Sequence, residues 1–262
     1  MSKILITGST DGLGKMAAQL LMEQGHEVVL HARNIQRAAD VLKVIPGTLK
    51  VVVGDLSRVA EIKAVAEQVN QLGHFDAIIH NAAIGYRESR RIETIDSLCH
   101  IFAINTLAPY ILTALIDKPK RLIYLSSGMH FSADTKLYDL NWMRRAWNGA
   151  AAYAESKFHN VLLAFAVARL FPDILVNAVE PGWVATKMGG PDAPDDLDAA
   201  PRTQAWLATS NEPEALVSGQ YFYHLQQRLP NPDTRDINKQ EHLLEYCAKI
   251  SGVYLNNGRR VI

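Results

Sequence analysis

Tyr153 and Lys157, four positions apart in the segment Ala-Tyr-Ala-Glu-Ser-Lys, have the types and spacing needed for proton transfer. In a helix, residues i and i+4 lie on one face with their side-chain tips within reach of each other. An ammonium group favours the phenolate, so we expect Lys157 to lower the pKa of Tyr153 from its ordinary value of about 10. Such a tyrosine can give and take a proton near neutral pH.

A glycine-spaced turn near the N-terminus indicates what this proton transfer serves. The apolar segment from Lys3 runs into Thr-Gly-Ser-Thr-Asp-Gly-Leu-Gly, with glycines at 8, 12 and 14. The spacing G-xxx-G-x-G differs from the usual G-x-G-x-x-G, but the same physics applies. Gly8 permits the tight turn, Gly12 lets backbone approach a pyrophosphate, and Gly14 lets the next helix pack closely. The amides that open this helix at Leu13 would face the phosphates, so the turn predicts a dinucleotide site.

The end of the second predicted strand indicates which dinucleotide binds. An acidic residue there would bind the adenosine ribose 2′-hydroxyl and repel a phosphate. Residues 28–34 read Val-Val-Leu-His-Ala-Arg-Asn, with no acid and with Arg33 just past the strand. A guanidinium suits a 2′-phosphate, with Ser9 and Arg37 as helpers. The sequence therefore favours NADP(H) over NAD(H).

Composition excludes several other classes of function. The 262 residues, 48% of them hydrophobic, are expected to form one large α/β domain, residues 1–262. Lys plus Arg and Asp plus Glu number 27 each, so no net charge favours nucleic acid or an anionic membrane surface. Cys99, Cys247 and the nine histidines show no metal-ligand spacing, so no metal is expected. There is no leader and no apolar run of spanning length, which predicts a cytoplasmic protein.

Short apolar segments alternate with longer amphipathic ones along the chain. Strands are predicted at 4–7, 28–31, 50–53, 77–80, 122–126, 175–179 and 220–223. Helices are predicted at 13–24, 35–44, 60–72, 94–116, 151–170, 202–208 and 237–250. Some strands are continuously apolar, such as Val51-Val52-Val53 and Ala77-Ile78-Ile79, which indicates burial on both faces. This alternation predicts a doubly wound, seven-stranded parallel sheet with helices on both faces.

Two irregular segments follow strand carboxyl ends, where open α/β sheets bind ligands. We interpret 129–149 and 188–200 as substrate-side loops. The second contains Gly189-Gly190, followed by Pro191 and Pro194, and it suits a mobile lid that excludes water during reaction. A static surface loop is the alternative.

The glycine turn together with Tyr153-Ala-Glu-Ser-Lys157 resembles the short-chain dehydrogenase/reductase family over nearly the whole chain. Further matching segments are Asp55-Leu56, Asn81-Ala82-Ala83, Asn105, Ser127 at the end of the fifth strand, and Pro181-Gly-Trp-Val-Ala-Thr186. Ser127 and Tyr153 are 26 positions apart, a long spacing that is similar to retinol-dehydrogenase-like members, as is the late helix at 237–250.

The resemblance implies a Rossmann-type fold and hydride transfer between the nicotinamide and a carbonyl or alcohol carbon. Tyr153 would give or take the proton of the oxygen, and Ser127 would hydrogen-bond the same oxygen. Lys157 would lower the pKa of Tyr153 and hold the nicotinamide ribose, and Asn105 would connect Lys157 to solvent through water. The implied cofactor contacts are Gly8, Ser9, Thr10, Gly12, Leu13, Gly14, Arg33, Asp55, Leu56, Asn81, Ala82, Ala83, Tyr153, Lys157, Pro181, Gly182, Val184 and Thr186.

The substrate is expected to be a small, hydrophobic carbonyl or alcohol compound. The candidate pocket residues share apolar or aromatic character and are Met129, His130, Trp183, Met188, and Trp142 or Trp147. The two tryptophans of the insertion would otherwise only pack it onto the domain. A homo-oligomer, dimer or tetramer, is a further expectation.

Two other functions deserve comparison. A non-catalytic NADP(H)-binding sensor or regulatory protein would not need the serine, tyrosine and lysine together. An isomerase or dehydratase of the extended branch would space its glycines G-xx-G-xx-G and add a C-terminal substrate domain. The sequence favours the oxidoreductase over both.

Overall fold

The chain forms one eight-stranded sheet in the computed structural model, which describes residues 1–45 and 50–255. The strands are β1 (Lys3–Ile6), β2 (Glu27–Ala32), β3 (Lys50–Val53), β4 (Ala77–His80), β5 (Arg121–Leu125), β6 (Leu175–Glu180), β7 (Gln220–Tyr223) and β8 (Gln226–Arg228). Their order is β3-β2-β1-β4-β5-β6-β7-β8, and every pairing is parallel except β7 with β8. The order reverses between β1 and β4, and this is where a doubly wound sheet binds ligands.

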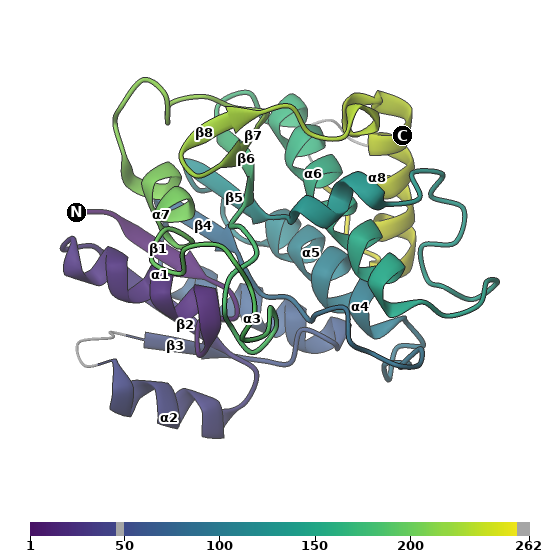
Figure 1. Cartoon of the computed structure of the whole chain (residues 1–262). Coiled ribbons are helices and arrows are strands. Elements are labelled where there is room, and N and C mark those ends of the chain that lie inside the picture. The colour runs from purple at the N-terminus through teal and green to yellow at the C-terminus, as the bar shows by residue number, and fades with distance from the viewer. Residues whose placement is uncertain (46–49, 256–262) are drawn as a thin grey trace.

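Helices cover both faces of the sheet (Figure 1). The α-helices are α1 (Gly12–Glu23), α2 (Ile35–Val44), α3 (Val59–Gln71), α4 (His100–Phe102), α5 (Ala108–Leu115), α6 (Gly149–Leu170), α7 (Arg202–Thr209) and α8 (Ile237–Ser251). Shorter helical segments are η1 (Ala103–Leu107, a π-helix), η2 (Gly128–Ser132) and η3 (Pro232–Arg235). None of the helices within these described ranges is long and apolar enough to cross a membrane.

The alternation of side chains along each strand builds two cores. In β1, Ile4 and Ile6 point to the face covered by α1, α2 and α7, whereas Leu5 points to the face covered by α3, α5, α6 and α8. Because successive strand residues face opposite sides, a strand buried on both faces must be continuously apolar. The predicted doubly wound fold is thus confirmed.

The strand count differs from the predicted seven by one short edge strand. β8 consists of Gln226, Gln227 and Arg228, which are all exposed, so no apolar pattern in the sequence predicts this strand. His224 and Leu225 have φ values of 46° and 64°, and they form the two-residue turn that folds β8 back along β7. Two successive left-handed residues are typical of the tightest hairpins, although glycine or asparagine is the usual choice there.

The single helix predicted over 94–116 is wrong at its N-terminal end. The Thr94 amide donates to the Leu98 carbonyl at 2.8 Å, and Ser97 is left-handed with φ 59°, so these residues form a closed turn. The Asn141 side chain then accepts from the Cys99 amide at 2.6 Å, immediately before α4 begins. Apolar spacing continues through this turn, but side-chain hydrogen bonds compete with the helix.

Helix α6 carries the Tyr153 segment and is buried on nearly all sides. The sheet, η2, η3 and α8 surround it, which explains why its sequence is apolar all round rather than amphipathic. The Asn148 side chain caps its start by accepting from the Ala151 amide at 3.0 Å. A helix enclosed in this way holds its side chains on a rigid support.

Candidate active site

The side chain of Asn81, the residue directly after β4, holds the glycine turn by hydrogen bonds. Its Nδ2 donates to the Thr7 carbonyl at 2.9 Å and to the Gly8 carbonyl at 3.2 Å. Gly8 has φ 63°, and a Cβ there would lie 2.7 Å from the Cα of Ala82. A Cβ on Gly14 would overlap Asn81 Nδ2. The turn therefore needs glycine at both positions, because larger residues would push it off the β4 segment.

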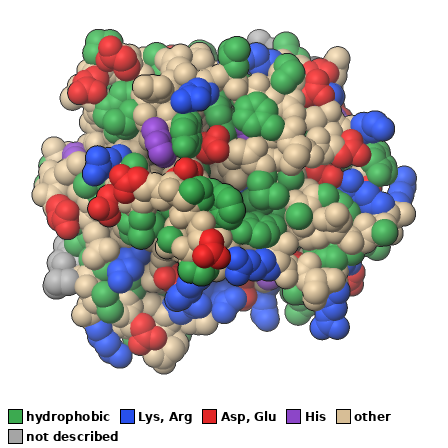
Figure 2. Space-filling model, viewed as in Figure 1, with side chains coloured by type: hydrophobic (Ala, Val, Ile, Leu, Met, Phe, Trp, Pro, Cys, Tyr) green, Lys and Arg blue, Asp and Glu red, His purple; other side chains and the backbone are tan. Residues whose placement is uncertain are grey.

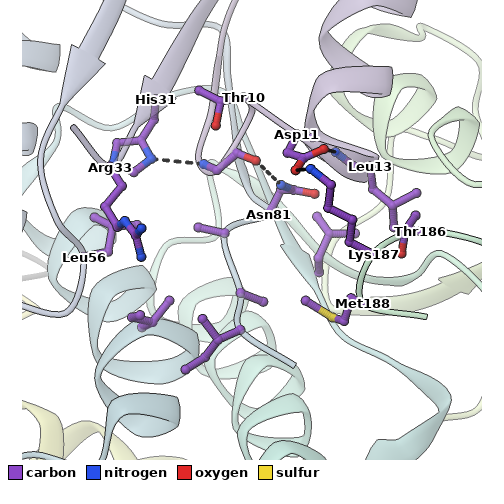
Figure 3. A pocket seen from close by; sticks show the side chains of 18 of the residues that line it. Thr10, Asp11, Leu13, His31, Arg33, Leu56, Asn81, Thr186, Lys187 and Met188 are labelled. Atoms are coloured by element: carbon purple, nitrogen blue, oxygen red, sulfur yellow. Dashed lines mark hydrogen bonds and ion pairs between the residues drawn. The ribbon is translucent and has the colours of Figure 1, made fainter. Parts of the chain in front are cut away.

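His31, in β2, ties the same turn to the neighbouring strand. Its Nδ1 accepts from the Gly8 amide at 3.1 Å (Figure 3). Its Nε2 donates to the Gly54 carbonyl at 2.9 Å. An amide can only donate, so the ring is neutral with its proton on Nε2. Burial lowers the pKa of His31 to about 4, in keeping with this state. This role of His31 was not predicted; its signal in the sequence is one polar residue inside an otherwise apolar strand.

A cleft of about 380 Å³ opens at the carboxyl ends of the strands and joins the turn to α6. Most of the predicted cofactor residues line it: Gly8, Thr10, Gly12, Leu13, Gly14, Arg33, Asp55, Leu56, Asn81, Ala82, Ala83, Tyr153, Lys157, Pro181 and Thr186. Arg37 lines it as well. These residues come from segments far apart in the sequence, so the fold alone brings them together (Figure 3).

Three predicted cofactor residues do not line the cleft. Ser9 is fully buried; its hydroxyl donates to the Ile6 carbonyl at 2.8 Å and accepts from the His31 amide at 3.0 Å. Gly182, with φ 92°, and the buried Val184 instead shape the segment after β6. The structure therefore places Ser9 as an internal brace of the turn, because its hydroxyl is already engaged by β1 and β2.

Tyr153 and Ser126 line the other end of the cleft, whereas the predicted catalytic Ser127 lies near Tyr153 but does not line the cleft. The Ser127 side chain lies close enough to the Tyr153 phenol to favour a lower pKa there, and its hydroxyl accepts from the Met129 amide at 3.3 Å. The neighbouring Ser126 hydroxyl donates instead to the carbonyl of Lys157 at 2.9 Å. Of the two serines, only Ser127 thus presents its hydroxyl to the tyrosine.

Lys157 lies beside Tyr153, with its Nζ 5.4 Å from the centre of the ring. The Nζ donates to the Leu125 carbonyl at 3.0 Å, and burial lowers the pKa of Lys157 to about 7. Burial also raises the pKa of Tyr153, despite the hydrogen bond from Ser127, which lowers it. This direction is opposite to the one predicted, because burial of the phenol disfavours its charged form and is the largest cause of the shift.

Asn105 lies behind the cleft, in the π-helix η1. Its Oδ1 accepts from the Ile84 amide at 2.9 Å, and its Nδ2 donates to the Ile84 carbonyl at 3.0 Å and to Ser156 Oγ at 3.0 Å. Single π-turns inside α-helices are frequent at functional sites. Here the side chain joins the segment after β4 to the helix that carries Tyr153.

The predicted substrate-pocket residues separate into two groups. Met188 lines the cleft, and its Sδ is 3.8 Å from the Tyr153 hydroxyl. His130 is fully buried, so it cannot touch a substrate. Trp142 and Trp147 pack on each other at 5.4 Å inside the insertion, where Trp147 Nε1 donates to the Glu88 carbonyl at 2.9 Å. The insertion tryptophans are therefore packing residues, which was the alternative interpretation.

The remaining pocket candidates lie at the margin of the cleft. Trp183 is 55% exposed, and its Nε1 donates to the Gly189 carbonyl at 3.0 Å. Met129 follows Ser127 in η2, and its carbonyl accepts from Ser132 Oγ at 2.9 Å. Neither side chain lines the cleft.

An ion pair spans the mouth of the cleft. Lys187 Nζ lies 2.5 Å from Asp11 Oδ2, and Asp11 also caps α1 by accepting from the Gly12 amide at 2.9 Å (Figure 3). The hydrogen bond from Lys187 is the largest cause that lowers the pKa of Asp11. The sequence analysis did not identify this pair, since 176 positions separate its members.

Metal ligation was not expected, and in residues 1–45 and 50–255 no group of three or more His, Cys, Asp or Glu side chains could hold an ion. The donor set of the cleft instead fits a dinucleotide. Backbone amides at the start of α1 face one part of it, the guanidinium groups of Arg33 and Arg37 another, and Tyr153 and Lys157 the far end.

Known proteins resemble this chain over almost its full length. A sequence model of the family described as short chain dehydrogenase matches residues 2–120. An uncharacterized oxidoreductase of Emericella nidulans is 45% identical over 262 residues, which cover 98% of this chain and 100% of that protein. The short-chain dehydrogenase chry4 of Gibberella zeae is 42% identical over 97% of this chain and 99% of its own. Human retinol dehydrogenase 13 is 30% identical over 95% of this chain and 84% of its own.

Solved structures share the fold at lower identity. A protein from Mycobacterium paratuberculosis has a TM-score of 0.85 at 22% identity, covering 98% of this chain and 95% of that one. An NADPH-bound carbonyl reductase from chicken fatty liver has a TM-score of 0.66 at 23% identity, covering 88% and 99%. With its full-length relatives and its doubly wound fold, the chain belongs to the short-chain dehydrogenase/reductase family as an NAD(P)-dependent oxidoreductase with a retinol-dehydrogenase-like relation.

Proposed function

We propose that this enzyme transfers a hydride between NADP(H) and a carbonyl or alcohol carbon of a small, hydrophobic substrate. One observation carries the proposal: Tyr153 and Lys157, with the Ser127 side chain near the phenol, line the same cleft as the glycine turn. The nicotinamide, when bound, supplies or accepts the hydride. The chain itself must then bind, orient and exchange one proton.

Each of the catalytic side chains has one task in this proposal. Tyr153 gives the substrate oxygen its proton on reduction and takes it on oxidation. The Ser127 hydroxyl already accepts from the Met129 amide, so its own proton is directed outward and stabilises charge that develops on the same oxygen. Lys157 holds the ribose end of the cofactor, and Asn105 fixes the segment at Ile84 against α6.

The proposed preference for NADP(H) is supported by the residues at the end of the cleft that would hold the adenosine of the cofactor. Arg33 directly follows β2 and lines the cleft, as does Arg37 in α2. No acid stands at the end of β2 to repel a 2′-phosphate. Two guanidinium groups offer charge-assisted, bidentate contacts that a ribose hydroxyl alone would not require.

A hydrophobic substrate is supported by what surrounds the Tyr153 phenol. Met188 lies against it, and the Tyr86 ring meets the Tyr153 ring edge-on at 5.7 Å. Apolar side chains gather in the middle of the face that carries the segment 182–200, with Lys and Arg side chains beside them (Figure 2). Human retinol dehydrogenase 13, a relative of this chain, takes its name from an apolar alcohol.

Other expectations accompany the proposal. A single domain over residues 1–262 is supported by the one sheet and the helices on both its faces, with 46–49 and 256–262 lying outside the described residues. A cytoplasmic location and a homo-oligomer, dimer or tetramer, stay predictions.

The function is tested by a mass spectrum of the native protein with any retained cofactor, followed by NADPH oxidation across a panel of aldehydes and ketones. We expect NADP(H) to be retained and turnover to be highest with apolar carbonyl compounds. Turnover with no compound in either direction, or equal use of NADH, would contradict the proposal.

A further inference from the structure

His130 is a fully buried histidine that lies three residues beyond Ser127, in η2. It cannot contact a substrate, and the proton transfer described above does not use it. Nevertheless, both ring nitrogens are engaged: Nδ1 is 2.8 Å from the Ser127 carbonyl oxygen, and Nε2 is 3.0 Å from the Asn231 amide nitrogen. These contacts suggest that the buried ring controls the position of the backbone at Ser127.

The partners determine the protonation state of the ring. The Asn231 amide can only donate, so Nε2 must be the unprotonated acceptor. The proton is therefore on Nδ1, which donates to the Ser127 carbonyl. Burial lowers the pKa of His130, which agrees with a neutral ring. One imidazole thus fastens the backbone of Ser127 to the segment before η3, a hundred residues away in the sequence.

A second layer holds the ring in place. The Tyr221 hydroxyl, in β7, is 3.4 Å from His130 Nδ1 and donates to Glu180 Oε2 at 2.7 Å. The two rings also pack on each other, with their centres 4.8 Å apart. A Cβ on Gly128 would overlap Glu180 Oε1, so the carboxylate lies directly against the backbone that follows Ser127. Glu180 of β6 and Tyr221 of β7 thus support the backbone at Gly128 and the ring of His130.

We propose that His130 is the positioning residue of Ser127, with Tyr221 and Glu180 holding its ring. The Ser127 Oγ accepts from the Met129 amide, so the position of this hydroxyl near Tyr153 depends on the first turn of η2 staying in place. The amide of His130 also donates to the Ser127 carbonyl, at 3.0 Å. The imidazole adds the contact that prevents this short helical turn from rotating. This inference rests on the catalytic role proposed for Ser127.

His130→Phe tests the proposal, because it keeps an aromatic ring of similar shape and removes both hydrogen bonds. We expect kcat to fall about 10- to 100-fold, since a small misplacement of a catalytic group has effects of this order. The dissociation constant for NADPH should change less than about twofold, because the cofactor cleft does not include His130. His130→Asn keeps a donor near the position of Nδ1 and should recover most of kcat.

A matched control separates positioning from general loss of stability. His159 in α6 is also buried, but it bonds to Thr106 at 3.1 Å rather than to Ser127. His159→Phe should leave kcat within about twofold of wild type, even if both phenylalanine variants melt at lower temperature. Tyr221→Phe, which keeps the ring and releases Glu180, should lower kcat by less than His130→Phe does.

The outcomes distinguish this inference from the proposed function. Wild-type kcat in His130→Phe, or an effect confined to KM or to the melting temperature, would overturn the inference and leave the function standing. If wild type turns over no carbonyl compound, the function fails. In that case, crystal structures decide the inference: an unchanged Ser127 rotamer in His130→Phe overturns it, and a rotated hydroxyl supports it.

Discussion

The Nδ1 atom of His31 accepts a hydrogen bond from the Gly8 amide at 3.1 Å, so a side chain of β2 holds the turn that follows β1. The other ring nitrogen holds the Gly54 carbonyl, just before Asp55. Both Gly8 and Asp55 line the cleft. One neutral imidazole therefore sets the spacing between the phosphate-facing turn and the segment near the adenosine end.

We predict that His31→Phe weakens NADPH binding. The change leaves the partly buried Gly8 amide and the carbonyl of the buried Gly54 without their partner, and an unsatisfied buried group typically costs about 1–3 kcal/mol, roughly 5- to 150-fold in affinity. His31→Asn offers an oxygen near the position of Nδ1 and should recover part of the loss. Fluorescence titration with NADPH and with adenosine 2′,5′-bisphosphate measures the affinity of both variants. Wild-type affinity in His31→Phe would contradict the prediction.

Arg33→Asp should reduce the preference for NADP(H). Losing a charge-assisted phosphate contact costs about 1.5–3 kcal/mol, or one to two orders of magnitude in NADPH affinity, whereas NADH affinity should stay nearly constant. Arg228→Asp, in β8 at the opposite edge of the sheet, is the matched control and should change neither. If wild type binds NADH as tightly as NADPH, Arg33 has no such role.

The fold was predictable from the sequence where burial alone determines the pattern. Continuously apolar strands and amphipathic helices located most elements within two residues. The exposed strand Gln226–Arg228 carries no apolar signal, and the closed turn at Thr94 depends on hydrogen bonds from its own side chains. Pattern reading cannot detect either, because neither depends on periodicity.

In the candidate site, too, local features were predictable and contacts between distant segments were not. Residues in the glycine turn and in the Tyr153 segment were predictable, because their spacing is local. The contacts of His31 and His130 join segments that only the folded sheet brings together. The direction of the Tyr153 pKa shift could not be predicted from the sequence either. The nearby Lys157 suggested a lowered pKa, but burial of the phenol, which residue spacing does not reveal, raises it.

Tyr153→Phe should abolish turnover and leave NADPH affinity nearly unchanged. The ring keeps its packing against Tyr86, but the transferable proton is lost, and losing a general acid typically costs about 10²–10⁴ in rate. Steady-state kinetics with the best substrate of the panel, alongside an NADPH titration, provides the measurement. Substantial remaining activity would mean that another group donates the proton.

Lys157→Met should stabilise the cofactor-free protein in a pH-dependent way. Burial lowers the pKa of Lys157 from 10.5 to about 7, so between these values the unfolded chain binds a proton that the folded chain lacks. Wild-type stability therefore rises with pH across this window, and below pH 7 it includes the full cost of a buried charge. Methionine removes that cost, and Asn160 Nδ2 still donates to the Leu125 carbonyl at 3.0 Å.

The gain in melting temperature for Lys157→Met should thus be largest below pH 7 and shrink toward pH 10. The exposed Lys249→Met in α8 serves as the control and should show no such trend. Activity should be lost in Lys157→Met at every pH, because its ribose contact is gone. A constant difference in melting temperature from pH 6 to pH 10 would show that folding does not lower the pKa of Lys157, which would then stay charged in the folded protein across this range.

The segment 188–200 is predicted to act as a lid whose order depends on ligands. Met188 lies over the Tyr153 hydroxyl, so a substrate oxygen can reach the tyrosine only if this side chain moves. Most hydrogen bonds of the segment are made to residues 183–186 just before it, such as those between Trp183 and Asp195. Its neighbour Lys187 reaches across the cleft mouth to Asp11 through an exposed ion pair. Ion pairs this exposed contribute at most about 1 kcal/mol, which permits opening.

Hydrogen exchange tests the lid in the free, NADPH-bound and ternary states. We expect protection of residues 189–198 to increase stepwise, because a closed loop excludes water from the reacting carbon. Lys187→Met should reduce that protection in the NADPH-bound state, whereas Lys187→Arg, which keeps the pair with Asp11, should not. Equal protection in all three states would instead identify the segment as a static loop, and Met188 would then be a fixed wall that limits the size of the substrate.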